Sequence, residues 1–228
     1  MKKLSKKLIA FALVLVMTVT AGAVIPQGTV EVQAASGRVY VNPYSATVVT
    51  YKPGSALSRF SSVISIMGCS KAKEIKNLKS SNKDIKVAPR DGYIRVEFGK
   101  KAAKSTITCT VKGVKLKTTL TVKKYSNPCK TFKIGKTKLT SKFNKIDVLR
   151  TNKAFKKQKL DIKLKNGWKI SSVHVTSGTG SYNNYRVNKS SFSKKITVSN
   201  NYGYIYVYCY NEKTKVSECL QINTSTRY

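Results

Sequence analysis

The sequence predicts an all-β protein that consists of two antiparallel β-sandwiches in tandem after an export signal. Apolar and polar residues alternate at period two in almost every segment beyond residue 35, which is typical of strands with one buried face. Polar turns separate many short alternating segments, and we find no convincing helical period of apolar residues among them. A hairpin pattern also recurs after about one hundred residues, the size of one sandwich domain.

The first 34 residues have the pattern of an export signal. Four lysines between residues 2 and 7 precede an apolar run over residues 8–16, and Val32-Gln33-Ala34 resembles a cleavage site. The alternative is a retained membrane anchor, but the apolar run is short for a span and Pro26 interrupts the looser apolar stretch after it. We therefore expect a cleaved signal and a secreted chain that begins near Ala35, with no membrane contact after cleavage.

The alternation is clearest over residues 114–123 and 160–165. In the first segment Val and Leu fall mostly on even positions, whereas Lys and Thr fall on odd positions. In the second, Leu160, Ile162 and Leu164 alternate with acidic and basic residues. One apolar face on each strand predicts sheets whose other face is solvated.

Two hairpins, over residues 105–122 and 204–222, are each expected to end a domain. Between them, Tyr125-Ser-Asn-Pro128 is a turn cluster that ends in proline. We therefore predict a signal peptide over residues 1–34, a first domain over residues 35–125 and a second domain over residues 126–228.

The first domain carries a recognisable series of motifs. Residues 78–87 read as a strand, a Ser-Ser-Asn turn and a second strand; Asp91-Gly92 comes next as a β-turn, and residues 105–122 form the closing hairpin. Over roughly residues 38–124 this order resembles the bacterial immunoglobulin-like domains of group two, with Leu78 where the family usually has Trp. The resemblance implies an immunoglobulin-like sandwich and a non-catalytic spacer or adhesion module of a surface or secreted protein. Periodicity and the repeat predict a second sandwich of the same kind.

The chain is strongly basic, with a net charge of +35. Removal of residues 1–34 takes away four lysines and Glu31, so 44 basic and 9 acidic residues become 40 and 8, a net charge of +32. Lysine supplies most of this charge, and lysine acts as a mobile point charge where arginine binds in fixed geometry. We therefore expect diffuse attachment to an anionic cell-wall or surface polymer, such as teichoic acid or an acidic glycan, and only non-specific contact with nucleic acid.

A tyrosine stripe offers an alternative function. If Ile205 and Val207 face the core, four tyrosines lie on the solvent face of the same strand: Tyr204, Tyr206, Tyr208 and Tyr210. Such a stripe could stack on sugar rings or bases, which would make the protein an adhesin or spacer that recognises a glycan or a protein. The alternatives are cross-strand packing of tyrosines in an ordinary strand, or packing between the two domains.

The sequence offers little for catalysis, cofactors or metals. Eight acids lie beyond residue 34: Glu74, Asp84, Asp91, Glu97, Asp147, Asp161, Glu212 and Glu218. They are isolated from one another, Glu218 is expected near a polar edge, and the single histidine, His174, is expected to face solvent. General acid–base chemistry needs convergent titratable groups, so an enzyme acting on wall polymers is the least favoured function and no cofactor or metal is expected.

The five cysteines are Cys69, Cys109, Cys129, Cys209 and Cys219. Cys69 and Cys109 lie in an early and a late predicted strand of the first domain, which suits an inter-sheet disulfide; two free buried thiols are the alternative. Cys209 should face the core and Cys219 the solvent, so a bridge between them would need a shift of register.

Overall fold

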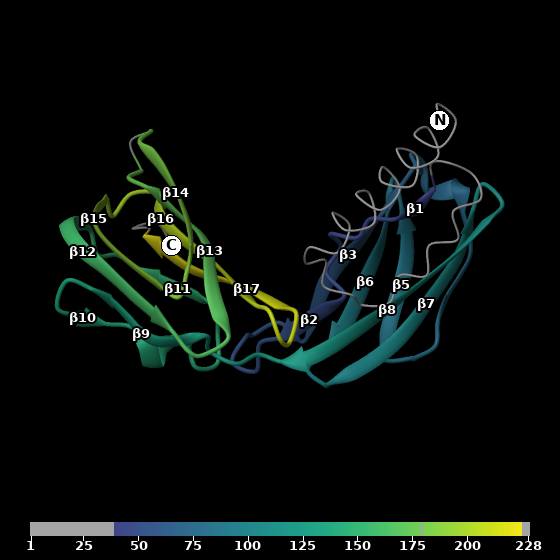
Figure 1. Cartoon of the computed structure of the whole chain (residues 1–228), viewed down its shortest axis with the longest axis horizontal. Helices are drawn as coiled ribbons and strands as arrows, with labels where there is room; N and C mark the ends of the chain where they lie inside the picture. Colours follow the sequence, from purple (N-terminus) through teal and green to yellow (C-terminus); the bar gives the residue numbers. More distant parts are fainter. Residues whose placement is uncertain (1–38, 179, 225–228) are drawn as a thin grey trace, which may run out of the picture.

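The computed structural model describes residues 39–178 and 180–224. In this part of the chain the predicted fold class is confirmed: the strands form two immunoglobulin-like β-sandwiches in tandem. Figure 1 shows them one after the other along the long axis of the molecule. The expected signal peptide, with its cleavage site at residues 32–34, lies outside the described residues. Among the described residues, no helix has the length and apolarity that a membrane span requires.

The first sandwich packs two four-stranded sheets face to face. One sheet has the order β1 (Tyr40–Val41), β3 (Arg59–Met67), β6 (Tyr93–Gly99) and β5 (Ile85–Arg90). The other has the order β2 (Val48–Tyr51), β8 (Val114–Lys124), β7 (Ala103–Val111) and β4 (Ile75–Ser80). A single 3₁₀ turn, η1 (Ala72–Glu74), precedes β4.

The second sandwich packs a four-stranded sheet against a five-stranded one. The smaller sheet has the order β10 (Thr137–Lys138), β9 (Cys129–Ile134), β12 (Phe155–Leu164) and β15 (Ser191–Val198). The larger has the order β11 (Val148–Thr151), β17 (Val216–Thr224), β16 (Gly203–Asn211), β13 (Trp168–Thr176) and β14 (Tyr182–Lys189). The 3₁₀ turn η2 (Thr140–Phe143) lies between β10 and β11.

Each sandwich combines antiparallel pairs with one parallel pair. β2 runs parallel to β8, the last strand of its sandwich, and β11 runs parallel to β17 in the same way. In both cases the chain has just crossed from one sheet to the other. Period-two alternation specifies the face on which a side chain lies and not the direction of the strand, so the sequence did not predict these two pairs.

Each sandwich encloses its own core. The buried residues of the first core run from Val41 to Val122, and those of the second from Tyr125 to Ile222. The predicted alternation is confirmed in β8 and β12, where Leu120 and Leu160 are fully buried. Burial of a large aliphatic side chain contributes about 1.5–3 kcal/mol, so these residues hold the sheets of each sandwich together.

The two sandwiches meet where β2 of the first lies beside β17 of the second (Figure 1). The Gly54 N–H donates a hydrogen bond of 3.0 Å to the Lys145 carbonyl across this junction. A methyl group on Gly54 would lie 2.8 Å from Lys145 Cβ and 3.0 Å from Ile146 Cγ2. The close approach of the two backbones therefore requires glycine at this position.

A polar cluster completes the junction and corrects one expectation. Glu218 was expected near a polar edge, but its side chain is only 2% exposed. Lys52 Nζ lies 2.6 Å from Glu218 Oε2 and 3.4 Å from Asp147 Oδ2, and the Thr50 hydroxyl donates a 2.6 Å hydrogen bond to Glu218 Oε1. Because Leu220 faces the core, Glu218 lies on the same inward face, at the end of β17 that the first sandwich covers.

Candidate functional site

The tyrosine stripe lies in the centre of the five-stranded sheet. Ile205, Val207 and Cys209 of β16 point into the core and are buried, which confirms that the tyrosines between them point outward. β13 brings His174 beside Tyr206, and β14 brings a further tyrosine to the same face. We name this surface the tyrosine face: His174, Tyr182, Tyr204, Tyr206, Tyr208 and Tyr210.

Most rings of the tyrosine face pack on one another. Tyr204 and Tyr206 are stacked, with centroids 4.5 Å apart, and Tyr206 meets Tyr208 edge to face at 6.5 Å. The His174 ring lies 4.9 Å from Tyr208 and 5.7 Å from Tyr182, and its Nδ1 is 3.1 Å from the Tyr182 hydroxyl. These contacts form a continuous ladder of rings across three strands.

The ladder limits what the tyrosine face can bind. Tyr204 and Tyr206 turn ring faces toward each other, so packing between neighbours on the same face of β16 accounts for them. With both sandwiches present, Tyr208 is 36% exposed and Tyr182 is 53% exposed. The first sandwich therefore does not cover this part of the tyrosine face. Burial raises the pKa of both Tyr206 and Tyr208.

Two other sheets present lysines on their outer faces. In the first sandwich, Lys79 and Lys117 flank Thr108, and Lys76 and Lys115 flank Thr110, across three adjacent strands. In the second, Lys159 of β12 lies directly opposite Lys195 of β15, whereas Lys133 of β9 pairs with Asp161 at 3.3 Å. We name these surfaces the lysine faces: Lys76, Lys79, Lys115, Lys117, Lys133, Lys159, Lys163 and Lys195. Like charges directly opposite each other destabilise a sheet unless an external anion offsets the repulsion.

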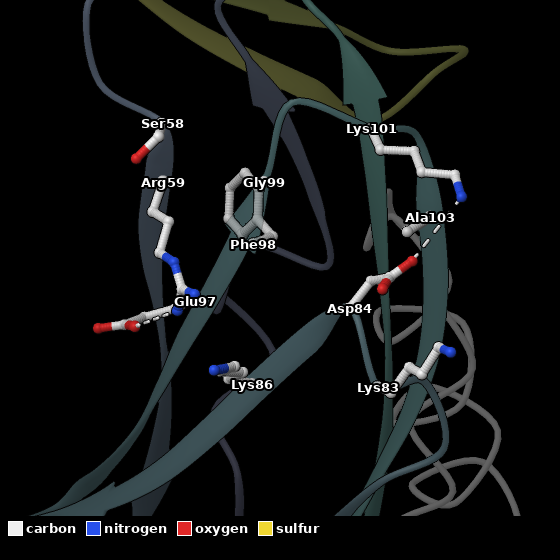
Figure 2. Close-up of a pocket in the computed structure, with 10 residues that line it drawn as sticks. All are labelled: Ser58, Arg59, Lys83, Asp84, Lys86, Glu97, Phe98, Gly99, Lys101 and Ala103. Carbon is white, nitrogen blue, oxygen red and sulfur yellow. Dashed lines mark ion pairs between the residues drawn. The ribbon is translucent and has the colours of Figure 1, made fainter.

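A groove at the junction end of the first sandwich was not predicted from the sequence (Figure 2). We name it the basic groove; its volume is about 610 Å³ and its lining is Ser58, Arg59, Lys83, Asp84, Lys86, Glu97, Phe98, Gly99, Lys101 and Ala103. Figure 2 shows Arg59 and Glu97 on one side of Phe98, and Asp84, Lys83 and Lys101 on the other. Four cations and two acids thus surround a buried phenylalanine.

Two lysines of the basic groove take no part in its ion pairs, although Lys86 lies opposite Glu97 in the register of β5 and β6. Arg59 lies 4.0 Å from Glu97, and Lys101 lies 3.9 Å from Asp84. Among the described residues, neither Lys83 nor Lys86 has an acidic group within 4.0 Å. The groove therefore keeps an excess of positive charge.

The Ser-Ser-Asn turn builds one wall of the basic groove. Asn82 accepts a hydrogen bond from the Asp84 N–H at 2.9 Å and donates one to the Lys104 carbonyl at 3.1 Å. The Ser81 hydroxyl accepts a further bond of 2.9 Å from the Thr106 N–H. These hydrogen bonds link the turn to the start of β7 and position the backbone of Lys83 and Asp84.

A second groove of about 490 Å³ continues from the basic groove toward the second sandwich. The two share Arg59 and Phe98, and the second groove ends at Asp147 and Ser217 of the other sandwich. Phe60 stacks on Phe98 with centroids 5.9 Å apart and forms part of the wall. The two grooves therefore adjoin at Arg59 and Phe98, and the second one reaches the domain junction.

The acids do not gather into an accessible catalytic pair among the described residues. The structure brings Asp147 and Glu218 to one lysine, but burial of Glu218 leaves no access for a substrate. Burial, together with the charge of Asp147, raises the pKa of Glu218, while Lys52 and Thr50 lower it in part. Within the described residues, no group of three His, Cys, Asp or Glu side chains is placed to hold a metal ion.

All five cysteines carry free thiols in the structure. Cys109 is buried, and burial together with the nearby Cys69 raises its pKa to about 11. Cys69 was expected within a strand, but it lies just beyond the end of β3. The Cys69–Cys109 disulfide is not formed here and stays a prediction for the oxidised protein. Cys209 is buried, whereas Cys219 lies on the outer face of β17, as the register predicted.

Comparison with known proteins adds only distant structural likenesses. No protein-family model matches the sequence, and no curated protein matches it. Fibronectin(III)-like modules of Clostridium thermocellum CbhA match with 15% identity and a TM-score of 0.31, over 82% of this chain and 94% of theirs. The titin A168–A169 pair matches with 11% identity and a TM-score of 0.27, over 83% and 100%. The Yersinia pseudotuberculosis adhesin InvE matches with 11% identity and a TM-score of 0.22, over 78% and 56%. At such scores, the strand order of the protein itself establishes the fold.

Proposed function

We propose that the protein is a secreted, non-catalytic binding module that attaches by charge to anionic cell-wall or surface polymers. The observation that carries the proposal is the gathering of lysines on the lysine faces of both sandwiches, with Lys159 directly opposite Lys195 in the second. A net charge of +32 beyond residue 34 supports it. We further propose that residues 35–125 form a bacterial immunoglobulin-like domain of group two and that residues 126–228 form the second domain.

The proposed attachment is electrostatic binding between a polycation and a polyanion. Each exposed lysine contributes little alone, but many contacts at once give strong binding that weakens as salt competes. Lysines that neutralise a polyanion release its condensed counterions, which makes the affinity depend steeply on salt. Teichoic acids and acidic glycans have this chemistry, and nucleic acid would bind without sequence preference.

The test is retention of the protein on isolated Gram-positive cell walls. We expect retention at low salt and release at high salt, because exposed charges are screened over about 10 Å at 0.1 M. Replacement of Lys159, Lys163 and Lys195 by alanine should lower the salt concentration that releases the protein. A protein that stays unbound at every salt concentration would refute the proposal.

A second candidate function is recognition of a glycan or protein by the tyrosine face. The exposure of Tyr182 and Tyr208, beside the stacked pair Tyr204 and Tyr206, favours it. Replacement of Tyr182 and Tyr208 by serine should abolish binding to a glycan array or matrix protein and leave salt-dependent wall attachment intact. Unchanged ligand binding would exclude this candidate.

A catalytic role is the least supported alternative. The only acids that the described residues bring to one lysine, Asp147 and Glu218, lie in the domain junction with Glu218 almost fully buried. We propose that their role is structural. Hydrolysis of a wall polymer that disappears in an Asp147→Asn variant would overturn this assignment.

A further inference from the structure

We propose that the basic groove is a defined binding site for acidic groups of a polyhydroxylated chain, and that the chain continues across the domain junction. This inference rests on the proposed attachment to anionic polymers and adds a specific site to it. The acidic groups could be phosphates or carboxylates, which share the chemistry that lysine and arginine recognise.

The charge of the basic groove favours an anion. Its two internal ion pairs, Arg59–Glu97 and Lys101–Asp84, are long and largely exposed. Exposed pairs of this kind contribute little free energy, so an incoming acidic group can compete for Arg59 and Lys101. Lys83 and Lys86 form no ion pair within 4.0 Å among the described residues and would bind the ligand directly.

The backbone that carries Lys83 and Lys86 is ordered. Lys83 lies in the Ser-Ser-Asn turn, where Asn82 bonds to both Asp84 and the Lys104 carbonyl. Lys86 lies in β5, which pairs with β6. Because the backbone is already ordered, a bound ligand needs to immobilise only the two lysine side chains.

Phe98 and the second groove indicate which chemical units connect the acidic groups of the ligand chain. Phe98 is 4% exposed and presents an apolar floor, which strengthens charge interactions above it. Beyond Arg59, the second groove offers serine hydroxyls beside Phe60 and the exposed Leu57. Hydroxyls beside apolar carbon suit sugar or polyol units of a chain.

A single-stranded nucleic acid fits the same grooves poorly. Such strands bind through exposed ring faces on which bases stack. Phe98 is buried, and one face of Phe60 is covered by Phe98. The arrangement therefore favours a chain without flat bases.

The experiment compares two variants of equal charge. Lys83→Ala/Lys86→Ala removes two positive charges from the basic groove, and Lys136→Ala/Lys138→Ala removes two from exposed positions in and beside β10. Binding of short oligomers of glycerol phosphate and of galacturonic acid is measured by calorimetry at low salt, with thermal unfolding as a check on folding. We expect the groove variant to lose about tenfold or more in affinity, as for two lost charge-assisted hydrogen bonds, and the control to change by less than about twofold.

The outcomes separate the groove from the general attachment. The oligomer that binds identifies phosphate or carboxylate as the group recognised. Equal losses in both variants, or no binding of either short oligomer by the wild type, would overturn the groove site even if long polymers are retained. Failure to retain long anionic polymers at any salt concentration would instead refute the proposed function.

Discussion

Lys52 of the first sandwich and Glu218 of the second form an ion pair of 2.6 Å across the domain junction. The side chain of Lys52 is 12% exposed and that of Glu218 is 2% exposed, so solvent screens the pair weakly. The Tyr125 ring lies beneath the Lys52 ammonium, 4.8 Å away, and adds a cation–π contact. The pair therefore joins the two sandwiches at a place that is largely shielded from solvent.

Replacement of Lys52 by alanine should destabilise the protein by about 3 kcal/mol, because Glu218 then remains buried without its cation. Denaturant unfolding at neutral pH measures the change. Lys115→Ala, which removes an exposed lysine from β8, is the matched control and should change stability by less than about 0.5 kcal/mol. Equal effects of the two replacements would contradict this role of Lys52.

The same variant should show a distinctive pH dependence. Burial raises the pKa of Glu218 above its ordinary value of 4.5, and loss of Lys52 should raise it further. A carboxyl with a raised pKa stabilises the fold fully below its unfolded pKa and loses that contribution as pH rises through the folded pKa. The stability difference between Lys52→Ala and the wild type should therefore be smallest near about pH 4 and widen toward about pH 7. A difference that does not vary with pH would exclude this explanation.

Glu74 should affect stability in the opposite direction. Its carboxylate accepts hydrogen bonds from the Ser70 and Lys71 N–H groups, and these bonds lower its pKa from 4.5 to about 2. The stabilisation is complete above the unfolded pKa and is lost as pH falls through about 2. Glu74→Gln should therefore melt below the wild type at about pH 6, and the two melting curves should converge toward about pH 2. Melting temperatures that stay a constant interval apart would argue against a charged Glu74 in this role.

The thiols should react in an order set by exposure and pKa. Cys129 and Cys209 are 1% exposed, and burial raises the pKa of Cys129 to about 12. Cys69 is partly exposed just beyond the end of β3, so a thiol reagent followed by mass spectrometry should label Cys69 first under native reducing conditions. Cys129 and Cys209 should react only after unfolding. Labelling of either at the rate of Cys69 would show that the second core is more open than described.

Replacement of Asn82 by alanine should loosen the Ser-Ser-Asn turn. It removes the bonds to the Asp84 N–H and the Lys104 carbonyl, at a cost of about 1–2 kcal/mol. Asn184→Ala, at an exposed position of the edge strand β14, is the control and should be nearly neutral. Thermal or denaturant unfolding measures both; a neutral Asn82→Ala would show that the turn does not depend on its side chain.

The fold was predictable from sequence because alternation reports directly which side of a strand is buried. Leu120 and Leu160 are buried, and the tyrosines of β16 point outward, as the pattern required. Alternation within one strand does not predict which other part of the protein covers the end of that strand. Glu218 was misplaced for this reason: it faces inward at a strand end that the other sandwich covers.

The basic groove was not predictable by the same means. Its lining comes from the ends of β3, β5, β6 and β7 and from two turns, which are separated along the chain. Only the Ser-Ser-Asn motif provided a local signal, because it places Lys83 in a fixed turn. Likewise, the tyrosine stripe was predicted, but its ring-on-ring packing depends on side-chain rotation that period two does not specify.

The most direct test of polyelectrolyte attachment is the affinity of the purified protein for a long anionic polymer over a series of salt concentrations. We predict that the logarithm of the affinity falls linearly with the logarithm of the salt concentration. If roughly six to ten lysines contact the polymer, the affinity should fall about a thousandfold or more between about 50 and 200 mM salt. An affinity that stays constant over this range would contradict attachment by charge.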